Sequence, residues 1–527
     1  MSLVGTFDLD PNRVLDVVLD IFEKNLWNYE SFLKLLKQFR KNNIVHIMGF
    51  KFAYYHKAVV DASTAANPQP TAGTSPTPPT SSTTTPASAT AASVEKPAQR
   101  SAPESLYRVA AILIVCDFMT LQDLLPYLQP VPADTKALQE EQEKLLVEQI
   151  KDFGMISLNA PAADKPASSS ATIPTSTSSQ ALNQGRDYSG KAAAVVADPV
   201  SYYEVAAKEE PEYADGNQLI GLAAAFLSLN CWDHCQQMLQ YLEAHAVNIM
   251  KVQDAKVAMI GFISYIINDV YVPISHLHAN LAKVSSIKEV QNIQIQHQFP
   301  KFSSLETLPT DMLPFLRHMG IELGTSPRLF TKICRLLRAH LLLLHGSRMD
   351  VGDKGVTIDI AAHKQALEPV KAVLGDILLP GLSISDSNAF LAEQLWQVIS
   401  LFPFQVRFEL YTTWVGGGLG KEGVGTKSSR VCMVEAKCLQ TAKGSLKRVS
   451  MENTRIMGRR LGRETNVCPI IVYTYVLTQI ESYDNLIPFI AESLKYGTFL
   501  AKDCMAYCML IQLHKDGEKL KKGTNTP

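Results

Sequence analysis

Apolar residues recur every three to four positions along much of this chain, the spacing that gathers side chains on one face of an α-helix. One stripe near the start comprises Val14, Val17, Val18, Ile21 and Phe22. Between residues 219 and 242, the same spacing joins Leu222, Phe226, Leu227, Met238, Leu239 and Leu242. A third stripe comprises Phe330, Ile333, Leu336, Leu337 and Leu341. The alternation of apolar and polar residues typical of β-strands is scarce, which predicts an all-α protein.

Many amphipathic helices joined by short turns, without a sheet, are typical of stacked helical pairs. We therefore predict a helical-repeat α-solenoid of the HEAT-like or armadillo-like type. No strict sequence repeat accompanies the pattern, so this prediction depends on the succession of helices alone.

Two helix starts near the C-terminal end are marked by an Asn followed by a Pro. Asn466 precedes Pro469 and the run IIVYTYVL, and Asn485 precedes Pro488 and FIAESL. Each Asn is predicted to cap its helix, and each Pro to occupy the first turn, where the missing N–H costs nothing. With turn residues between them, the two helices are predicted to form an antiparallel pair, the unit of a solenoid.

Two stretches of low complexity interrupt this pattern. Residues 61–103 and 159–199 are mostly Ala, Pro, Ser and Thr, with too few apolar side chains to offset a backbone ordering cost of about 1–2 kcal/mol per residue. We predict that the first is a disordered insertion and the second a disordered linker. The helical regions are then residues 1–60 with 104–158, residues 200–414 and residues 431–514. A Gly-rich loop at 415–430 and a flexible basic end at 515–527 complete the chain.

Charge and cysteine content narrow the class of protein. The chain has 50 Lys and Arg residues against 51 Asp and Glu residues, so it has no overall electrostatic preference for nucleic acid or an anionic membrane. Nine cysteines in 527 residues, without a CxxC pair, indicate reduced thiols rather than a disulfide framework. The sequence contains neither a signal peptide nor an apolar run of about 18 residues. We expect a soluble intracellular protein without membrane contact.

Two patterns resemble small-ligand motifs, and in both a structural role is favoured. Residues 416–425 contain a GxGxxG spacing, but the preceding segment is predicted to be helical, so a flexible loop is favoured over a nucleotide site. Cys231, His234 and Cys235 lack a second cluster of metal ligands, so buried helix residues are favoured over a zinc site. Cys504 and Cys508 are interpreted in the same way. Without a local catalytic signature, we predict no enzyme activity, cofactor, metal or small-molecule substrate.

The segment 443–463, KGSLKRVSMENTRIMGRRLGR, is strongly basic. On a single projected helix, one face carries Leu446, Val449, Ile456, Met457 and Leu461. The opposite face carries Arg448, Arg455, Arg459 and Arg463. Such a ridge can follow phosphates, which makes direct RNA binding by residues 448–463 the alternative function. A solvated helix face or a docking face for an acidic partner is favoured, because the ridge lacks aromatic residues for base stacking.

Six segments carry a specific resemblance to a known family. They read FDLDPNRVLDVVLDIFE (7–23), HIMGFKFAYY (46–55), SLYRVAAILIVCDFMTLQDLLPYLQP (105–130), NQLIGLAAAFLSLNCWDHCQQMLQYL (217–242), LFPFQVRFELYTTW (401–414) and QIESYDNLIPFIAESLKYGTFLAKDCMAY (479–507). In this order, they resemble the THO complex subunit 2 family, the largest subunits of the THO part of the transcription-export complex. The resemblance covers nearly the whole chain outside the low-complexity stretches.

The resemblance implies a non-catalytic scaffold in the nucleus that couples transcription and mRNA processing to mRNA export. The implied partners are the other THO complex subunits and the DEAD-box mRNA export helicase, with mRNA as a weak or indirect partner. It also implies that residues 431–514 begin a HEAT-like middle domain, and that segment 443–463 with the helices up to Tyr507 forms a partner surface. Because family members are much longer, we expect a partial chain whose apolar end is exposed after Gln512.

Overall fold

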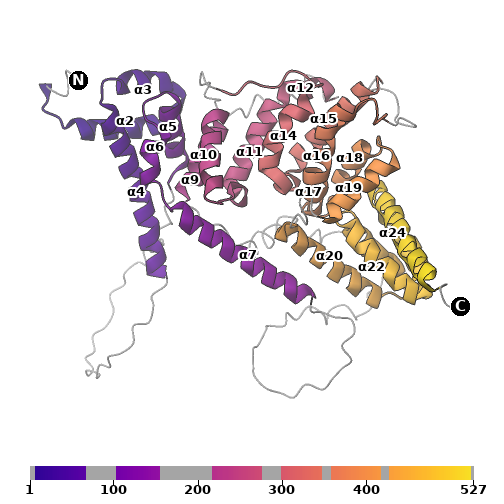
Figure 1. Cartoon of the computed structure of the whole chain (residues 1–527). Helices are drawn as coiled ribbons and strands as arrows, with labels where there is room; N and C mark the ends of the chain where they lie inside the picture. Colours follow the sequence, from indigo (N-terminus) through magenta and orange to yellow (C-terminus); the bar gives the residue numbers. More distant parts are fainter. Residues whose placement is uncertain are drawn as a thin grey trace, which may run out of the picture. The chain divides into compact units, whose positions relative to one another are not determined.

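The computed structural model describes residues 6–66, 102–154, 217–275, 298–346, 358–416, 427–450 and 452–523. Every regular element in these residues is a helix, which confirms the predicted all-α solenoid class (Figure 1). The first helices are α2 (Pro11–Lys24), η1 (Leu26–Asn28), α3 (Tyr29–Leu36), α4 (Lys41–Ala66), α5 (Glu104–Val115), α6 (Leu121–Leu124), η2 (Leu125–Tyr127) and α7 (Pro132–Gly154). They are followed by α9 (Gln218–Ser228), α10 (Trp232–Ala244), η3 (Ile249–Lys251), α11 (Gln253–Ile266), α12 (Asn268–Ile274), α14 (Leu308–Met319), η4 (Gly320–Thr325) and α15 (Pro327–Leu344).

The remaining helices lead to the C-terminal end. They are α16 (Lys364–Ala372), η5 (Val373–Leu378), α17 (Leu379–Ser383), α18 (Ala389–Ile399), α19 (Phe404–Gly416), α20 (Ser429–Lys447), α21 (Thr454–Thr465), α22 (Pro469–Ser482), η6 (Asp484–Leu486), α23 (Ile487–Ser493), η7 (Leu494–Tyr496) and α24 (Phe499–Gly523). Of the short elements, η5 is a π-helix and the other η elements are 3-10 helices.

The predicted irregular segments lie mainly outside the described residues. This holds for residues 67–101 of the first insertion, for the whole linker 159–199 and for most of the Gly-rich loop. α4 continues to Ala66 and α24 to Gly523, so each helix extends past the boundary predicted for its region, at residues 60 and 514.

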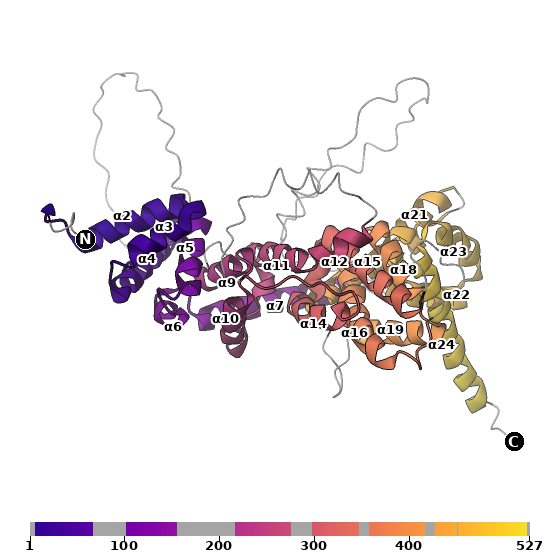
Figure 2. The same ribbon diagram turned by 90° about the horizontal axis from the view of Figure 1, so that it is seen from above.

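Neighbouring helices pack against each other in the manner expected of stacked pairs. α9 lies against α5, α10 and α11, while α15 lies against α18, and α22 against α24 (Figure 2). Most of these partners are close in sequence, as in a solenoid. Whether the repeats are of the HEAT or the armadillo type stays a prediction.

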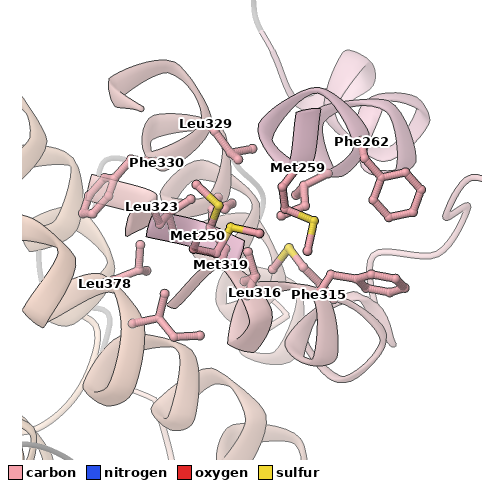
Figure 3. Close-up of a cluster of buried hydrophobic side chains, with 14 of the residues drawn as sticks. Met250, Met259, Phe262, Phe315, Leu316, Met319, Leu323, Leu329, Phe330 and Leu378 are labelled. Carbon is pink, nitrogen blue, oxygen red and sulfur yellow. The ribbon is translucent and has the colours of Figure 1, made fainter. Parts of the chain in front are cut away.

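One core cluster joins η3, α11, α14, η4, α15 and η5 through methionine, leucine and phenylalanine side chains. Figure 3 shows Met250, Met259, Phe262, Phe315, Leu316, Met319, Leu323, Leu329, Phe330 and Leu378 gathered there, and all of them are buried. Trp232, at the start of α10, stacks on Phe262 with ring centroids 5.4 Å apart. It also makes an edge-to-face contact with Phe315, with ring centroids 4.7 Å apart. Burial of each such side chain contributes about 1.5–3 kcal/mol, so this cluster is a major source of stability.

The predicted apolar stripes have three different outcomes. The stripe of α15 is confirmed, because all five of its predicted residues are buried. The predicted residues between 219 and 242 are also buried, but they belong to two helices, α9 and α10, separated at residues 229–231. In α2 the prediction was partly wrong, since Val17 and Ile21 are exposed and Leu15, Leu19 and Phe22 form the buried stripe.

Three helices end on a residue other than glycine in the left-handed backbone region. Asp117, Asn230 and Ala246 follow α5, α9 and α10 with φ of 60°, 60° and 57°. After α10, the amide of Val247 donates to the carbonyl of Leu242 at 2.9 Å, the six-to-one bond of a Schellman motif. These ends satisfy the last carbonyls of each helix at the cost of backbone strain.

A carboxylate in α24 fastens this helix to α19. Asp503 accepts hydrogen bonds from Nε and Nη2 of Arg407, at 3.0 and 3.1 Å, and from the hydroxyl of Tyr411 at 2.7 Å. The guanidinium also lies over the ring of Trp396, 5.5 Å from its centroid. Because the pair is largely shielded from solvent, it fixes how α24 meets the preceding helices.

A second charge cluster fastens the start of α20. Glu322 in η4 accepts from Nζ of Lys256 at 3.2 Å and from Nη1 of Arg430 at 2.5 Å. Lys256 belongs to α11, so three elements distant in sequence meet at one carboxylate.

Within the described chain, no single helix is long and apolar enough to cross a membrane. The helices α11 and α12 reach the required length and hydropathy only when they are taken together, and they are bent by 64° relative to each other.

Candidate partner-binding surface

The basic segment 443–463 forms two helices instead of the predicted single one. α20 ends at Lys447, and Arg448 is its C-terminal cap, with its amide donating to the carbonyl of Ser445 at 3.3 Å. The side chain of Asn453 then accepts from the amide of Ser450 at 2.7 Å and donates to the carbonyl of Arg448 at 2.8 Å. Side chain to backbone bonds of this kind compete with helical bonds, which explains why the helix stops here.

Because of this break, the predicted faces of the segment are wrong in part. Arg448 belongs to the end of α20, so it does not continue the row of arginines on α21. Ile456, predicted on the apolar face, is 67% exposed. Leu446 and Leu461 are both buried, but they lie on different helices and do not share the predicted face.

α21 packs against its neighbours through a face that contains two glycines. Gly458, Leu461, Gly462 and Thr465 are the buried residues of this helix, at the spacing of one helical face. A Cβ atom at Gly462 would lie 2.7 Å from Cβ of Tyr496, so only glycine allows α21 to lie this close to η7. Figure 2 shows α21 beside α23, with which it also packs. The glycine spacing was visible in the sequence and was the signal that could have located the buried face.

The opposite side of α21 is an exposed face that we call the arginine face. Its members are Arg455, Ile456, Arg459, Arg460 and Arg463. Three of the predicted arginines, Arg455, Arg459 and Arg463, therefore do share one exposed side of a helix. Arg460 was missed by the sequence prediction, although it also is exposed.

The arginines of the arginine face form no close ion pair with the described side chains. Among the described residues, the ion pairs shorter than 4.0 Å do not include any of its four arginines. Glu492, the acid beside Arg455, is paired with Lys495 at 2.5 Å, and its pKa is lowered mainly by the hydrogen bond from Lys495. Arg459 lies over the ring of Tyr496, 5.5 Å from the centroid. The face therefore presents a concentrated positive charge to solvent.

At the two predicted helix starts, the prolines lie in the first helical turn as predicted, but the asparagines do not cap these helices. Pro469 begins α22 and Pro488 lies in the first turn of α23. Asn466 instead closes α21, and its side chain oxygen accepts from the amide of Thr498 at 3.3 Å. Asn485 lies in η6 and makes no capping bond to α23.

The predicted pairing of these two helices is also wrong. α22 packs mainly against α24, while α23 packs against α21. The 3-10 helix η6 lies between α22 and α23, and α23 is only seven residues long, so it offers little length for packing along α22. Each of these two helices thus packs mainly against a helix that does not directly follow or precede it in the sequence.

The cysteine and histidine candidates of α10 are packing residues. Cys231 and Cys235 are buried, and both thiols donate to backbone carbonyls, at 3.6 and 3.9 Å. Burial raises the pKa of Cys231 to about 12, so its thiol is protonated at neutral pH. His234 stacks on Phe226 at 5.8 Å. In the described part of the chain, no group of three or more His, Cys, Asp or Glu side chains could hold a metal ion.

Two further sequence motifs, the cysteine pair of α24 and the glycine-rich motif, were considered as ligand sites. Cys504 and Cys508 are buried in α24, and burial raises the pKa of both, that of Cys508 to about 11. The glycine motif at 416–425 lies outside the described residues except for Gly416, the last residue of α19. As predicted, a helix precedes this motif, whereas a phosphate-binding loop follows a strand.

Family models and individual relatives agree on the family to which this chain is similar. Residues 1–298 and 293–459 match the family described as THO complex subunit 2 N-terminus, and residues 461–526 match the family described as transcription- and export-related complex subunit. THO complex subunit 2 of Mus musculus is 27% identical over 533 residues, covering 100% of this chain and 27% of that protein. The Arabidopsis thaliana protein of the same name is 25% identical over 528 residues, covering 99% of this chain and 25% of that protein. This chain thus spans about a quarter of the length of these curated relatives.

Proposed function

Because this chain belongs to the THO complex subunit 2 family, we propose that it is a non-catalytic scaffold within a THO complex, coupling transcription and mRNA processing to nuclear mRNA export. The observation that carries this proposal is the family match, which runs through residues 1–459 and 461–526. The all-helical architecture supports it, since stacked helices offer long surfaces that bind partners by area.

The proposed partners are the other subunits of the THO complex and the DEAD-box mRNA export helicase. The proposed location is the nucleus, where these partners would be met. Residues 431–514 are proposed to begin a HEAT-like middle domain, with α20, α21 and the helices up to Tyr507 as the surface that docks the helicase. The exposed arginine face and its rigid support on η7 favour this part of the chain as a partner surface.

Affinity purification from nuclear extract tests the scaffold function. The tagged chain is used as bait, with and without RNase treatment, and the recovered proteins are identified by mass spectrometry. We expect recovery of the THO complex subunits after RNase treatment. Recovery of none of them under either condition would refute the scaffold function for this chain.

Direct RNA binding is the second candidate function, and the exposed arginines Arg455, Arg459 and Arg463, with Arg448 nearby in the sequence, are the observation in its favour. Each phosphate contact would add to the salt dependence of the affinity. Recovery of THO subunits only in the absence of RNase would support this function over the protein scaffold.

A further inference from the structure

We propose that the arginine face of α21 binds an acidic protein segment that carries an apolar anchor residue. The proposal deepens the scaffold function given above, on which it rests, by naming the kind of partner for one surface. It follows from four properties of the face: its unpaired charge, its exposed isoleucine, its lack of a free aromatic platform and its rigid support.

The charge of the face calls for an acidic ligand. Arg455, Arg459 and Arg463 follow each other at intervals of four residues, so their Cα atoms extend over roughly 12 Å of helix. Arg460 lies beside this row, and none of the four has a carboxylate partner within 4.0 Å among the described side chains. A row of exposed guanidinium groups at this spacing fits carboxylates on one face of a helical or extended segment.

The exposed isoleucine favours a protein over RNA. Ile456 is 67% exposed and lies within the row of arginines, one residue after Arg455 and four before Arg460. A phosphate backbone gains nothing from contact with an isoleucine side chain. A protein segment does, because burying a side chain of this size contributes about 1.5–3 kcal/mol. Arginine itself is enriched at protein interfaces.

The face also lacks an aromatic ring that a nucleotide base could stack on. Tyr496, the ring beside the arginine face, is already covered by the guanidinium of Arg459 at 5.5 Å. Single-stranded RNA is commonly held by bases stacked on free aromatic rings, in addition to phosphate contacts. The Tyr496 ring is therefore occupied by a contact within the protein and is not open to a nucleotide base.

The rigid support of α21 lowers the cost of binding. Gly458 and Gly462 hold this helix against Ser493 and Tyr496, with a hypothetical Cβ at Gly462 only 2.7 Å from the tyrosine. This close packing supports the backbone of α21, and the helix itself sets the spacing of the arginines and Ile456. A preorganised surface of this kind loses less entropy on association than a mobile one.

Fluorescence anisotropy with the whole chain tests the proposal. The probe is a fluorescein-labelled peptide with one leucine flanked on both sides by glutamates, compared with the same peptide carrying serine in place of leucine and with a 12-nucleotide oligo(U) RNA. The variants are Arg459→Glu with Arg463→Glu, and separately Ile456→Ser. Arg13→Glu in α2, another exposed arginine, is the matched control.

We expect the leucine peptide to bind, with an affinity at least tenfold lower for the double charge reversal and about three- to tenfold lower for Ile456→Ser. The control variant and the serine peptide separate the effects of charge and of the apolar anchor. If the charge reversal unfolds α21, as circular dichroism would detect, Arg459→Gln with Arg463→Gln provides the same comparison.

Three results would overturn the proposal: no saturable binding of the leucine peptide, equal affinity of the double charge-reversal variant and the control, or RNA binding that the charge reversal abolishes while Ile456→Ser has no effect. The purification from nuclear extract is scored separately. If the unmodified chain recovers THO subunits but the peptide does not bind, this inference fails and the scaffold function stands. If no THO subunit is recovered, the scaffold function fails whatever the peptide does.

Discussion

The attachment of α24 to α19 through Asp503 can be tested by removing one carboxylate. Asp503→Ala deletes the acceptor of three hydrogen bonds, two from Arg407 and one from Tyr411. The side chains of Arg407 and Asp503 are only 20% and 15% exposed, so water replaces these bonds incompletely. The arginine is then left with its charge partly buried and without its counter-ion.

The magnitude of this loss follows from the burial of the pair. Breaking a fully buried ion pair by removing one partner costs about 3–5 kcal/mol, and a surface pair contributes about 0–1 kcal/mol. Because Asp503 and Arg407 are mostly but not fully buried, we expect Asp503→Ala to lower the free energy of unfolding by about 2–4 kcal/mol. Asp503→Asn keeps an acceptor for Tyr411 but loses the charge, and is expected to cost roughly 1.5–3 kcal/mol.

Hydrogen exchange of the α24 amides is the direct assay, because it reports separation of this helix even if the remaining helices stay folded. A loss of about 2–4 kcal/mol corresponds to roughly 30- to 700-fold faster exchange. Urea unfolding followed by the fluorescence of Trp396 and Trp414, in α18 and α19, provides a second reading. Asp484→Ala, at an exposed position in η6, is the matched control. Equal exchange rates in α24 for the Asp503 and Asp484 variants would refute the reasoning.

Three further changes test other parts of the structure. Ala246→Gly is expected to raise the free energy of unfolding by about 0.5–1 kcal/mol in urea denaturation, because it relieves the positive φ of 57° at an exposed residue; a loss of stability would contradict the strain argument. Gly462→Ala is expected to cost about 1–3 kcal/mol through the clash with Tyr496, whereas Gly444→Ala, with open space at its Cβ, is expected to be neutral or stabilising; equal effects on thermal unfolding would refute close packing at α21. Burial lowers the pKa of His340, so as the pH falls below about 6.5 the unfolded chain takes up a proton before the folded chain does, and stability declines. His340→Gln is expected to flatten this decline in denaturation measured between pH 7.5 and 5.5, and an unchanged slope would show that other groups cause it.

The class of fold was predictable from local spacing alone. A residue that repeats at three- to four-position intervals lies on one helical face wherever the helix is placed, and so the stripe of α15 was identified correctly from its apolar residues. The prolines at the starts of α22 and α23 were also predictable, because the restriction of proline to a first turn is a property of its own backbone.

The breaks between helices and the partners of each helix were harder to predict. Asn453 ends the helical pattern of the basic segment by bonding to the nearby backbone, in competition with helical hydrogen bonds. Asn466 was expected to cap α22, but its side chain oxygen bonds the amide of Thr498, which approaches only when the chain is folded. Sequence position therefore indicated a polar residue at a helix end, without indicating which backbone amide it would serve.

The arginine face combines one property that follows from local spacing with another that depends on tertiary packing. That three arginines four residues apart share one side of a helix follows from the amino-acid order alone, because it depends only on helical geometry. Which side is buried was decided by the tertiary structure, through the close approach of Tyr496 to Gly462. That contact leaves Ile456 in solvent, although the projected helix placed it on the apolar face with Leu461. Spacing within a helix is a local property, whereas burial depends on which other part of the chain the helix meets.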